Sequence, residues 1–206
     1  MARVQKQSDT SPFEDPLVAA TAIEALARAH AMGLLSGEIA RLDQTAMRGL
    51  GKGLADAGIA RGLNLELEAA ANTDPEQLCV LFKKISAALD GSPVPDREWR
   101  AVERHLGLES MAELIGISAS SGRRYLAGER STPDGVAARL HFLAFVVGDL
   151  AGAYNDVGVR RWFHRPRKLL NGNTPAQLLV GAWEPHDDGP RQVRALAASI
   201  GPSPAT

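Results

Sequence analysis

Cysteine is nearly absent from this sequence, in which Cys79 is the only one among 206 residues. A single thiol cannot build a disulfide framework, so nothing in the composition requires an oxidising compartment. Long apolar runs are also missing, because the most apolar window, residues 137–153, contains Arg139, His141 and Asp149. A membrane span needs about 20 mostly apolar residues, so we expect this window to be a buried helix instead. The first sixteen residues lack the apolar core of a signal peptide, and we expect a cytoplasmic protein without a membrane partner.

Aromatic side chains are scarce (5%), and β-branched residues rarely alternate with polar ones. These two shortages argue against strands, whereas abundant alanine and leucine favour helices. A hydrophobic content of 45% is sufficient for a core. The sequence therefore predicts an all-α protein with an N-terminal helical domain, a helix-turn-helix unit and a small C-terminal helical domain.

Prolines and glycines indicate where this chain divides. Two prolines and a glycine fall within residues 91–95, a stretch that cannot continue a helix, so we expect a domain boundary near residue 92. The predicted divisions are a disordered tail at 1–15, a helical domain of unknown role at 16–91, a helix-turn-helix region at 92–131, a C-terminal helical domain at 132–200 and a disordered tail at 201–206.

Capping residues predict where several helices begin. Pro16 begins a helix that runs towards Gly33, and Asp74-Pro75 begins one that continues to Leu89. Further starts are predicted at Asp96, Thr132-Pro133, Thr174-Pro175 and Arg191. Residues 36–71 are expected to be helical but interrupted by their glycines, at positions 49, 51, 53, 58 and 62.

No pattern of catalytic, metal-binding or cofactor-binding residues is evident. The glycines around Lys52 lack the Ser or Thr that follows lysine in a phosphate loop, and no strand precedes them. None of the five histidines has another ligand at helical spacing, and we expect His141 to be a hydrogen-bonded core residue. We therefore expect no metal, no cofactor and no enzymatic activity.

Positive charge is concentrated in the middle of the chain. Residues 96–170 carry 12 Lys and Arg against 9 Asp and Glu, whereas residues 1–95 carry 9 against 12. The basic region contains "IGISASSGRRYLAGER", residues 115–130, which fits the spacing of a DNA-reading helix-turn-helix. Six of its seven constrained positions are satisfied when Leu108 is the first residue, namely Met111, Ala112, Ile115, Gly116, Ile117 and Tyr125.

The seventh position holds Gly122, where a valine or isoleucine would normally pack, so we expect an empty packing position. Around it, the serines can meet phosphates at a helix N-terminus, and the arginines can bond guanine or phosphate. Arg130, just past Gly128, is better placed for the DNA backbone. The predicted DNA-binding residues are Ser118, Ser120, Ser121, Arg123, Arg124 and Arg130.

The same stretch could instead be an ordinary αα-hairpin, in which the serines only cap a helix and the arginines are solvated. Glu109 favours this alternative, because a carboxylate that faced the duplex would repel phosphate.

A second basic segment, "VRRWFHRPRKLLNGNTPAQLLVGAW", covers residues 159–183. Its arginines and aromatics could form a nucleic-acid surface. The alternative favoured here is that Trp162 and Phe163 anchor a helix to the core, before a proline-bounded turn and an Asn-Gly-Asn loop.

The order of these parts resembles the Xre/MbcA/ParS-type antitoxins over roughly residues 96–200. The similarity lies in the helix-turn-helix, the long apolar helix, the Trp-Phe-x-x-Pro segment, "LLNGNTPAQLL" and the final "VRALAASI". Such antitoxins pair with RES-domain toxins, enzymes that consume NAD. The resemblance implies a homodimer that binds operator DNA and a C-terminal domain that occludes the toxin. The toxin-binding residues it implies are Arg161, Arg165, Arg167, Lys168, Asn171 and Asn173.

Two other functions remain open from the sequence. The first 90 or so residues have no counterpart in a compact antitoxin, so the chain could be a stand-alone transcriptional regulator. Gly122 and Glu109 would instead suit a protein-interaction module that no longer reads DNA.

Overall fold

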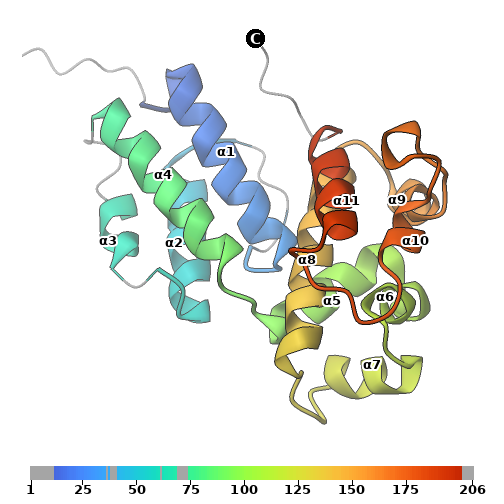
Figure 1. The fold of residues 1–206 in the computed structure, drawn as a ribbon. Coiled ribbons are helices and arrows are strands. Elements are labelled where there is room, and N and C mark those ends of the chain that lie inside the picture. Colours follow the sequence, from blue (N-terminus) through green and yellow to red (C-terminus); the bar gives the residue numbers. More distant parts are fainter. Residues whose placement is uncertain (1–11, 36, 38–40, 61, 69–73, 201–206) are drawn as a thin grey trace, which may run out of the picture.

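The computed structural model describes residues 12–35, 37, 41–60, 62–68 and 74–200 (Figure 1). Over these residues it contains helices and no strand, which confirms the all-α fold. The predicted tails at 1–11 and 201–206 lie outside the described residues. Pro12–Glu14, inside the expected disordered tail, form a short 3-10 helix, and Phe13 packs against the N-terminal core.

The N-terminal helices form one cluster around a core of alanine, leucine and methionine side chains. These helices are α1 (Pro16–Ala31), α2 (Gln44–Ala57), α3 (Leu63–Glu68) and α4 (Pro75–Asp90). Asp15 caps α1 by accepting hydrogen bonds from the N–H groups of Leu17 and Val18, and Asp74 caps α4. Helices α1 and α4 lie side by side (Figure 1). Both begin with a proline, as the sequence predicts.

The glycines of α2 correct the expectation that they interrupt a helix. Gly49, Gly51 and Gly53 lie inside α2, and only Gly58 ends it, in the left-handed conformation. A Cβ at Gly53 would lie 2.6 Å from the carbonyl oxygen of Leu34. The glycine therefore permits a close approach between this helix and the chain after α1, which offsets its low helix propensity.

The C-terminal half surrounds one long helix, α8 (Asp134–Ala151), most of which is buried as expected, although the helix ends before residues 152–153, which are exposed (Figure 1). The other helices are α5 (Pro95–Leu106), α6 (Leu108–Ile115), α7 (Ala119–Leu126), α9 (Asp156–Phe163), the 3-10 helix η3 (Lys168–Leu170), α10 (Pro175–Leu178) and α11 (Asp188–Ala198). Helices α5 and α11 both pack on α8. One hydrophobic core takes side chains from α5 to α11.

Three predicted helix starts differ from the structure, and a fourth is confirmed. The last helix, α11, begins at Asp188 and not at Arg191, because its N-cap is Asp187. Asp96 is not a cap, because Pro95 already occupies the first turn of α5, for which its fixed φ is suited. Thr132 does not cap α8, because its hydroxyl accepts the indole N–H of Trp99 at 2.9 Å. Thr174 caps α10 in a reciprocal capping box with Gln177, as the Thr-Pro pair predicts.

The two hydrophobic cores meet where α1 crosses α8. Phe145 of α8 packs into the N-terminal core rather than its own. A Cβ at Gly148 would lie 2.6 Å from the Cβ of Ala31, so α1 approaches α8 where α8 has no side chain. The boundaries expected near residues 92 and 131 stay predictions, although the cores separate around the linker at 91–95.

Candidate functional site

Helices α6 and α7 are joined by a turn at Gly116, where a helix-turn-helix requires it. Gly116 has a φ of +78°, a left-handed conformation that favours glycine. Four inward positions, Met111, Ala112, Ile115 and Tyr125, are buried as predicted. Ile117 is partly buried against the same core. The spacing of the sequence thus corresponds to two short helices with a shared apolar side.

Gly122 does not leave an empty packing position, contrary to expectation. It is buried, and a Cβ there would lie 3.1 Å from Cδ1 of Leu108 and 3.8 Å from Cβ of Ala112. The side chain of Leu108 therefore fills the space that a valine would take. Sequence reasoning missed this contact because Leu108 was considered only as the first residue of the unit.

The predicted DNA-binding side chains lie at the N-cap of α7, on α7 itself and in the loop that follows it. Ser120, Arg123 and Arg124 are exposed at helical spacing, opposite the buried Gly122 and Tyr125. Their arrangement gives α7 one polar, basic face and one packed face. This face can approach a nucleic acid without disturbing the core.

Two serines have a capping role in the structure. The hydroxyl of Ser118 accepts the backbone N–H of Ser121 at 3.1 Å and donates to the hydroxyl of Ser121 at 3.0 Å. Such a cap stabilises the N-terminus of α7 and fixes the direction of its first turn. Capping leaves the remaining N–H groups of that turn available to a phosphate oxygen.

The three predicted arginines differ in their surroundings. Arg123 is paired across the unit with Glu109 of α6 at 3.5 Å, and both side chains are well exposed. Arg130 lies over the ring of Tyr125 at 5.9 Å. Arg124 has no hydrogen-bond or ion-pair partner among the described residues. Of the three, Arg124 is thus the most readily available to a ligand.

The turn of the unit is held by two side chains that sequence reasoning missed. Nη1 of Arg139 in α8 donates to the carbonyl of Ile115 at 2.9 Å and reaches that of Gly181 at 3.3 Å. The indole N–H of Trp183 donates to the carbonyl of Leu114 at 2.9 Å. These bonds satisfy free carbonyls at the C-terminus of α6 and connect the turn to the loop after α10. The signal in the sequence was the lone tryptophan in "GAW".

Trp162 and Phe163 anchor α9 to the core, as the favoured interpretation of this segment predicts. Both are buried, and their rings meet edge to face at 5.2 Å. They are therefore not free to stack on bases. The positive charge of the segment comes instead from the residues beside them.

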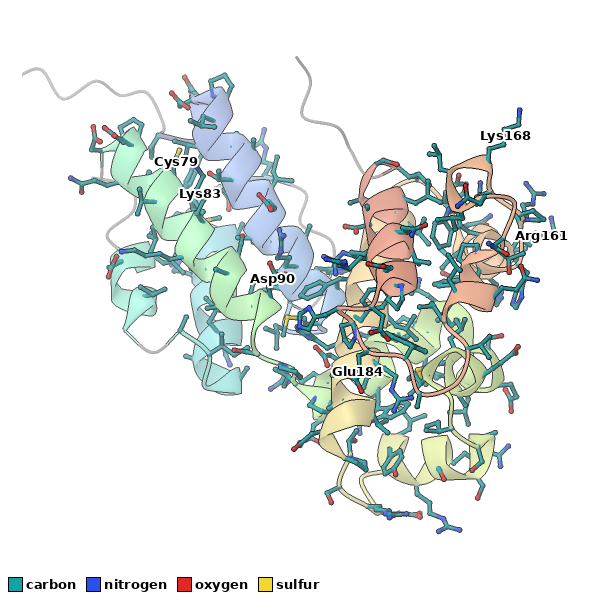
Figure 2. All side chains as sticks on the ribbon, in the orientation of Figure 1. Cys79, Lys83, Asp90, Arg161, Lys168 and Glu184 are labelled. Atoms are coloured by element: carbon teal, nitrogen blue, oxygen red, sulfur yellow. The ribbon has the colours of Figure 1, made fainter. Side chains whose placement is uncertain are left out.

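The predicted toxin-binding residues divide into an exposed and a structural group. Arg161, Arg165, Lys168 and Asn171 are exposed, and Figure 2 shows Arg161 and Lys168 pointing away from the core. Arg167 is partly buried and Asn173 is exposed, and both hold the loop, because the backbone N–H of Arg167 donates to the carbonyl of Asn173 at 3.0 Å. Asn173 Nδ2 also donates to the carbonyl of Leu170.

A small cleft lies at the exposed arginines of this segment. It measures about 210 Å³ and is lined by Tyr154, Gly158, Arg161, Trp162, Arg165 and Arg167. Arg167 also lies over the ring of Trp162 at 5.4 Å. Three guanidinium groups around one cleft favour a carboxylate or phosphate ligand.

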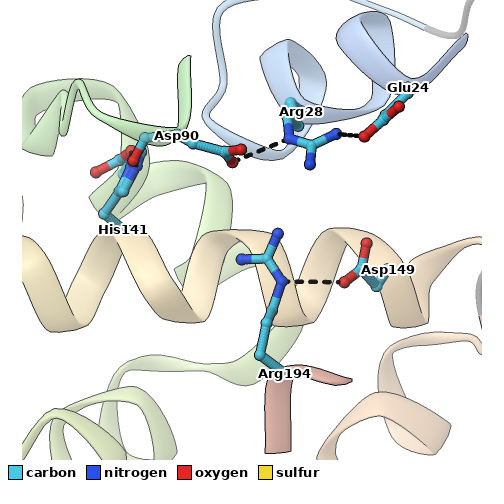
Figure 3. Close-up of polar contacts among 7 residues, drawn as sticks. Glu24, Arg28, Asp90, His141, Asp149 and Arg194 are labelled. Carbon is cyan, nitrogen blue, oxygen red and sulfur yellow. Dashed lines mark hydrogen bonds and ion pairs between the residues drawn. The ribbon is translucent and has the colours of Figure 1, made fainter. Parts of the chain in front are cut away.

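A polar network joins the two halves of the molecule next to the linker (Figure 3). Nδ1 of His141 lies 2.5 Å from Oε1 of Glu98, and its Nε2 lies 3.1 Å from the carbonyl of Asp90. A carbonyl only accepts, so Nε2 carries a proton and a second proton is shared between Nδ1 and Glu98. The pair is therefore neutral overall, which suits the burial of both residues. This confirms His141 as a hydrogen-bonded core residue.

The network extends from Asp90 to α1, since its carboxylate accepts a hydrogen bond from Nε of Arg28 at 2.9 Å. On the same face of α8, Arg194 of α11 lies 3.4 Å from Asp149 and over the ring of Phe145 at 4.6 Å. Burial raises the pKa of Asp149, and it lowers the pKa of Arg194. Desolvation therefore outweighs the mutual attraction of this pair.

Comparisons with models of known protein families, with curated proteins and with solved structures gave no match to this chain. No group of three or more metal-binding side chains occurs among the residues that the structure describes. Within the same residues, none of the helices combines the length and apolarity that crossing a membrane would take.

Proposed function

We propose that this chain is the antitoxin of a toxin–antitoxin pair, which binds operator DNA through α7 and represses its own operon. The observation that carries the proposal is the exposed face of α7, where Ser120, Arg123 and Arg124 project from a helix capped by Ser118 and packed through Tyr125. A short helix with small residues at its N-terminus and arginines beyond them suits the major groove.

The second part of the proposal is that the C-terminal arginine segment neutralises a RES-like, NAD-consuming toxin by direct contact. It is supported by the resemblance of residues 96–200 and by the cleft lined by Arg161, Arg165 and Arg167. These residues belong to α9 and the loop after it, away from α7 (Figure 1). The chain would thus contact DNA and toxin through different surfaces.

Further features follow from this function. The protein acts in the cytoplasm as a homodimer without catalysis of its own, because one recognition helix reads too few bases for specificity. A two-fold operator would place the two α7 helices about 34 Å apart.

Titration of the chain against its own promoter fragment at several salt concentrations tests DNA binding. Replacing Arg124 by alanine should cost about 1–3 kcal/mol if it reads a base, and a smaller, sequence-independent amount if it meets phosphate. Arg48→Ala, an exposed arginine of α2, is the control and should bind as the parent does. Unchanged affinity of Arg123→Ala/Arg124→Ala would contradict the assignment.

The pair between Arg123 and Glu109 favours one alternative, a protein-interaction module that does not read DNA. Glu109→Gln separates the two functions, because it removes a carboxylate beside the proposed phosphate-binding face. If α7 binds DNA, this variant should bind more tightly, by up to about tenfold, and more so at low salt. An interaction module would show no salt-dependent DNA binding in either protein.

Coexpression with an adjacent RES-type reading frame tests neutralisation. Arg161→Glu/Lys168→Glu should abolish rescue of growth while retaining DNA binding, since both side chains are exposed. The absence of such a reading frame, together with intact promoter binding, would favour the stand-alone regulator.

A further inference from the structure

A large cavity among the described residues lies between the two halves of the molecule. It has a volume of about 1120 Å³, and its walls come from α1, α5, α8 and the chain between α1 and α2. Ligand sites in proteins typically measure about 300–1,000 Å³ and occur preferentially at domain interfaces. Neither the proposed DNA contact nor the proposed toxin contact uses this cavity.

One part of the cavity wall is apolar and consists of small and branched side chains. Ala27 and Leu26 of α1 face it together with Ala144 and Val147 of α8. Ile23, which lines the same wall, is 50% exposed. An exposed isoleucine beside an open apolar cavity leaves hydrophobic surface that a ligand could cover.

Among the described residues that line the cavity, every titratable side chain is basic. The four are His30, Arg41, Arg104 and His105, and no Asp or Glu is among the described lining residues. His105 alone is paired, through Nδ1 to Asp156 at 2.8 Å. Arg41 and Arg104 have no hydrogen-bond or ion-pair partner in the described part of the chain.

These basic groups are close enough to affect one another. Burial lowers the pKa of His30, and the positive charge of Arg104 and His105 lowers it further. The positive charge beside the apolar wall thus comes from Arg104 of α5 and from Arg41 before α2, while His30 of α1 offers a ring N–H. Such an arrangement is typical of a site that awaits an anion.

We propose that this cavity binds a small carboxylate with an apolar tail, with the carboxylate at Arg104, Arg41 and His30 and the tail along Ala27 and Ala144. A carboxylate compensates the guanidinium groups through charge-assisted hydrogen bonds, and the tail covers Ile23. A cationic ligand would add to the positive charge, and a neutral one would leave it uncompensated. The proposal does not depend on the function proposed for α7.

Calorimetric titration of the full chain with octanoate tests the site, with 1-octanol and octyltrimethylammonium as probes of the same tail length. Octanoate should bind at one site per chain, at least tenfold more tightly than either other probe. Arg104→Gln should weaken octanoate binding roughly tenfold or more, because one charge-assisted bond is lost. Arg48→Gln, an exposed arginine on α2 outside the cavity, should leave it unchanged.

A second variant fills the cavity without removing charge. Ala27 is an exposed position of α1, so Ala27→Phe should abolish octanoate binding while the melting temperature stays near that of the parent. Equal binding of all three probes, or octanoate binding that survives Ala27→Phe, would overturn the proposal. So would an absence of octanoate binding together with a dimer that Ala27→Phe dissociates, because the cavity would then be covered by a second copy.

Discussion

The hydrophobic cores of the two halves of the molecule are built from different kinds of side chain. The core of α5 to α11 contains six buried aromatic side chains, namely Trp99, Tyr125, Phe142, Trp162, Phe163 and Trp183. In the N-terminal core, Phe82 is the one buried aromatic that α1 to α4 contribute among the described residues. There, alanine, leucine and glycine allow close helix approach instead.

This difference distinguishes the surface of α7, which directional contacts hold in place, from the cavity wall at α1, which lacks such contacts. Aromatic side chains add directional contacts, such as the indole N–H bonds of Trp99 and Trp183, which fix the helices beside α7. Small side chains provide no such directionality, and the cavity lies where the alanines of α1 face α8. The C-terminal half is thus suited to present fixed side chains, and the N-terminal half to accommodate a ligand.

Among the variants considered, replacement of Trp183 should have the largest effect on the free energy of unfolding. It is buried, packs edge to face on Phe142 at 5.0 Å and donates to Leu114. Trp183→Ala should lower the free energy of unfolding by about 3–5 kcal/mol. Trp183→Phe retains much of the packing and should lose about 1–3 kcal/mol for the unmade bond. Denaturant unfolding measures both, and a Trp183→Phe protein as stable as the parent would show that the hydrogen bond contributes nothing.

Gly148→Ala tests the crossing of the two halves. The new methyl group would lie 2.6 Å from Cβ of Ala31, so α1 or α8 must move. We expect a loss of about 1–3 kcal/mol in the free energy of unfolding, measured by denaturant titration. Gly49→Ala, where a Cβ meets nothing within 4 Å, is the matched control and should be neutral or stabilising. A loss that is equal in both variants would contradict a specific contact with Ala31.

The pair of Asp149 and Arg194 makes stability depend on pH. Because burial raises the pKa of Asp149, the folded state retains a proton that the unfolded state releases above about pH 4. Its contribution to stability is therefore fully present below that pH and is lost as the pH rises through the raised pKa. Arg194→Leu removes the cation that opposes this shift, so the loss between pH 4 and 7 should increase.

Unfolding curves at several pH values measure this effect, which we expect to be about 1–2 kcal/mol because the side chains are partly exposed. Asp149→Asn/Arg194→Leu, which lacks the titrating group, should lose this pH dependence. A steeper fall of stability towards low pH in Arg194→Leu would contradict the assignment.

Substitution of Gly122 should have the smallest effect. Alanine adds helix propensity, and the only close neighbour is the terminal methyl of Leu108 at 3.1 Å, which can rotate away. Gly122→Ala should therefore change the free energy of unfolding by less than about 1 kcal/mol, with DNA affinity unchanged. Gly122→Val has no room for two further methyl groups and should destabilise the unit. A stabilised valine variant in thermal unfolding would show that the position is empty after all.

Several features could be predicted because they depend on local rules. Pro16 and Pro75 begin helices since a fixed φ and a missing N–H suit the first turn. Gly116 marks the turn between α6 and α7 because a left-handed residue was required there. Six of the seven constrained helix-turn-helix positions could be recognised from spacing alone.

Other features depend on residues distant in the sequence and were not predicted. Leu108 occupies the space at Gly122, Arg139 and Trp183 hold the turn, and Gly53 permits contact with Leu34. None of these pairs follows a helical period. Arg123 also pairs with Glu109, which only the crossing of α6 and α7 brings together.

The sequence by itself determined that the chain is helical, where several helices begin, and which short stretch has the spacing of a helix-turn-helix. Propensity, capping and hydrophobic period act over a few residues, so they can be recognised without a structure. Only the tertiary structure decided which arginine of α7 is unpaired and how Arg167 and Asn173 stabilise their loop. It also decided where four basic side chains line one cavity with an apolar wall. These outcomes depend on helix crossings, which bring together side chains that no local pattern connects.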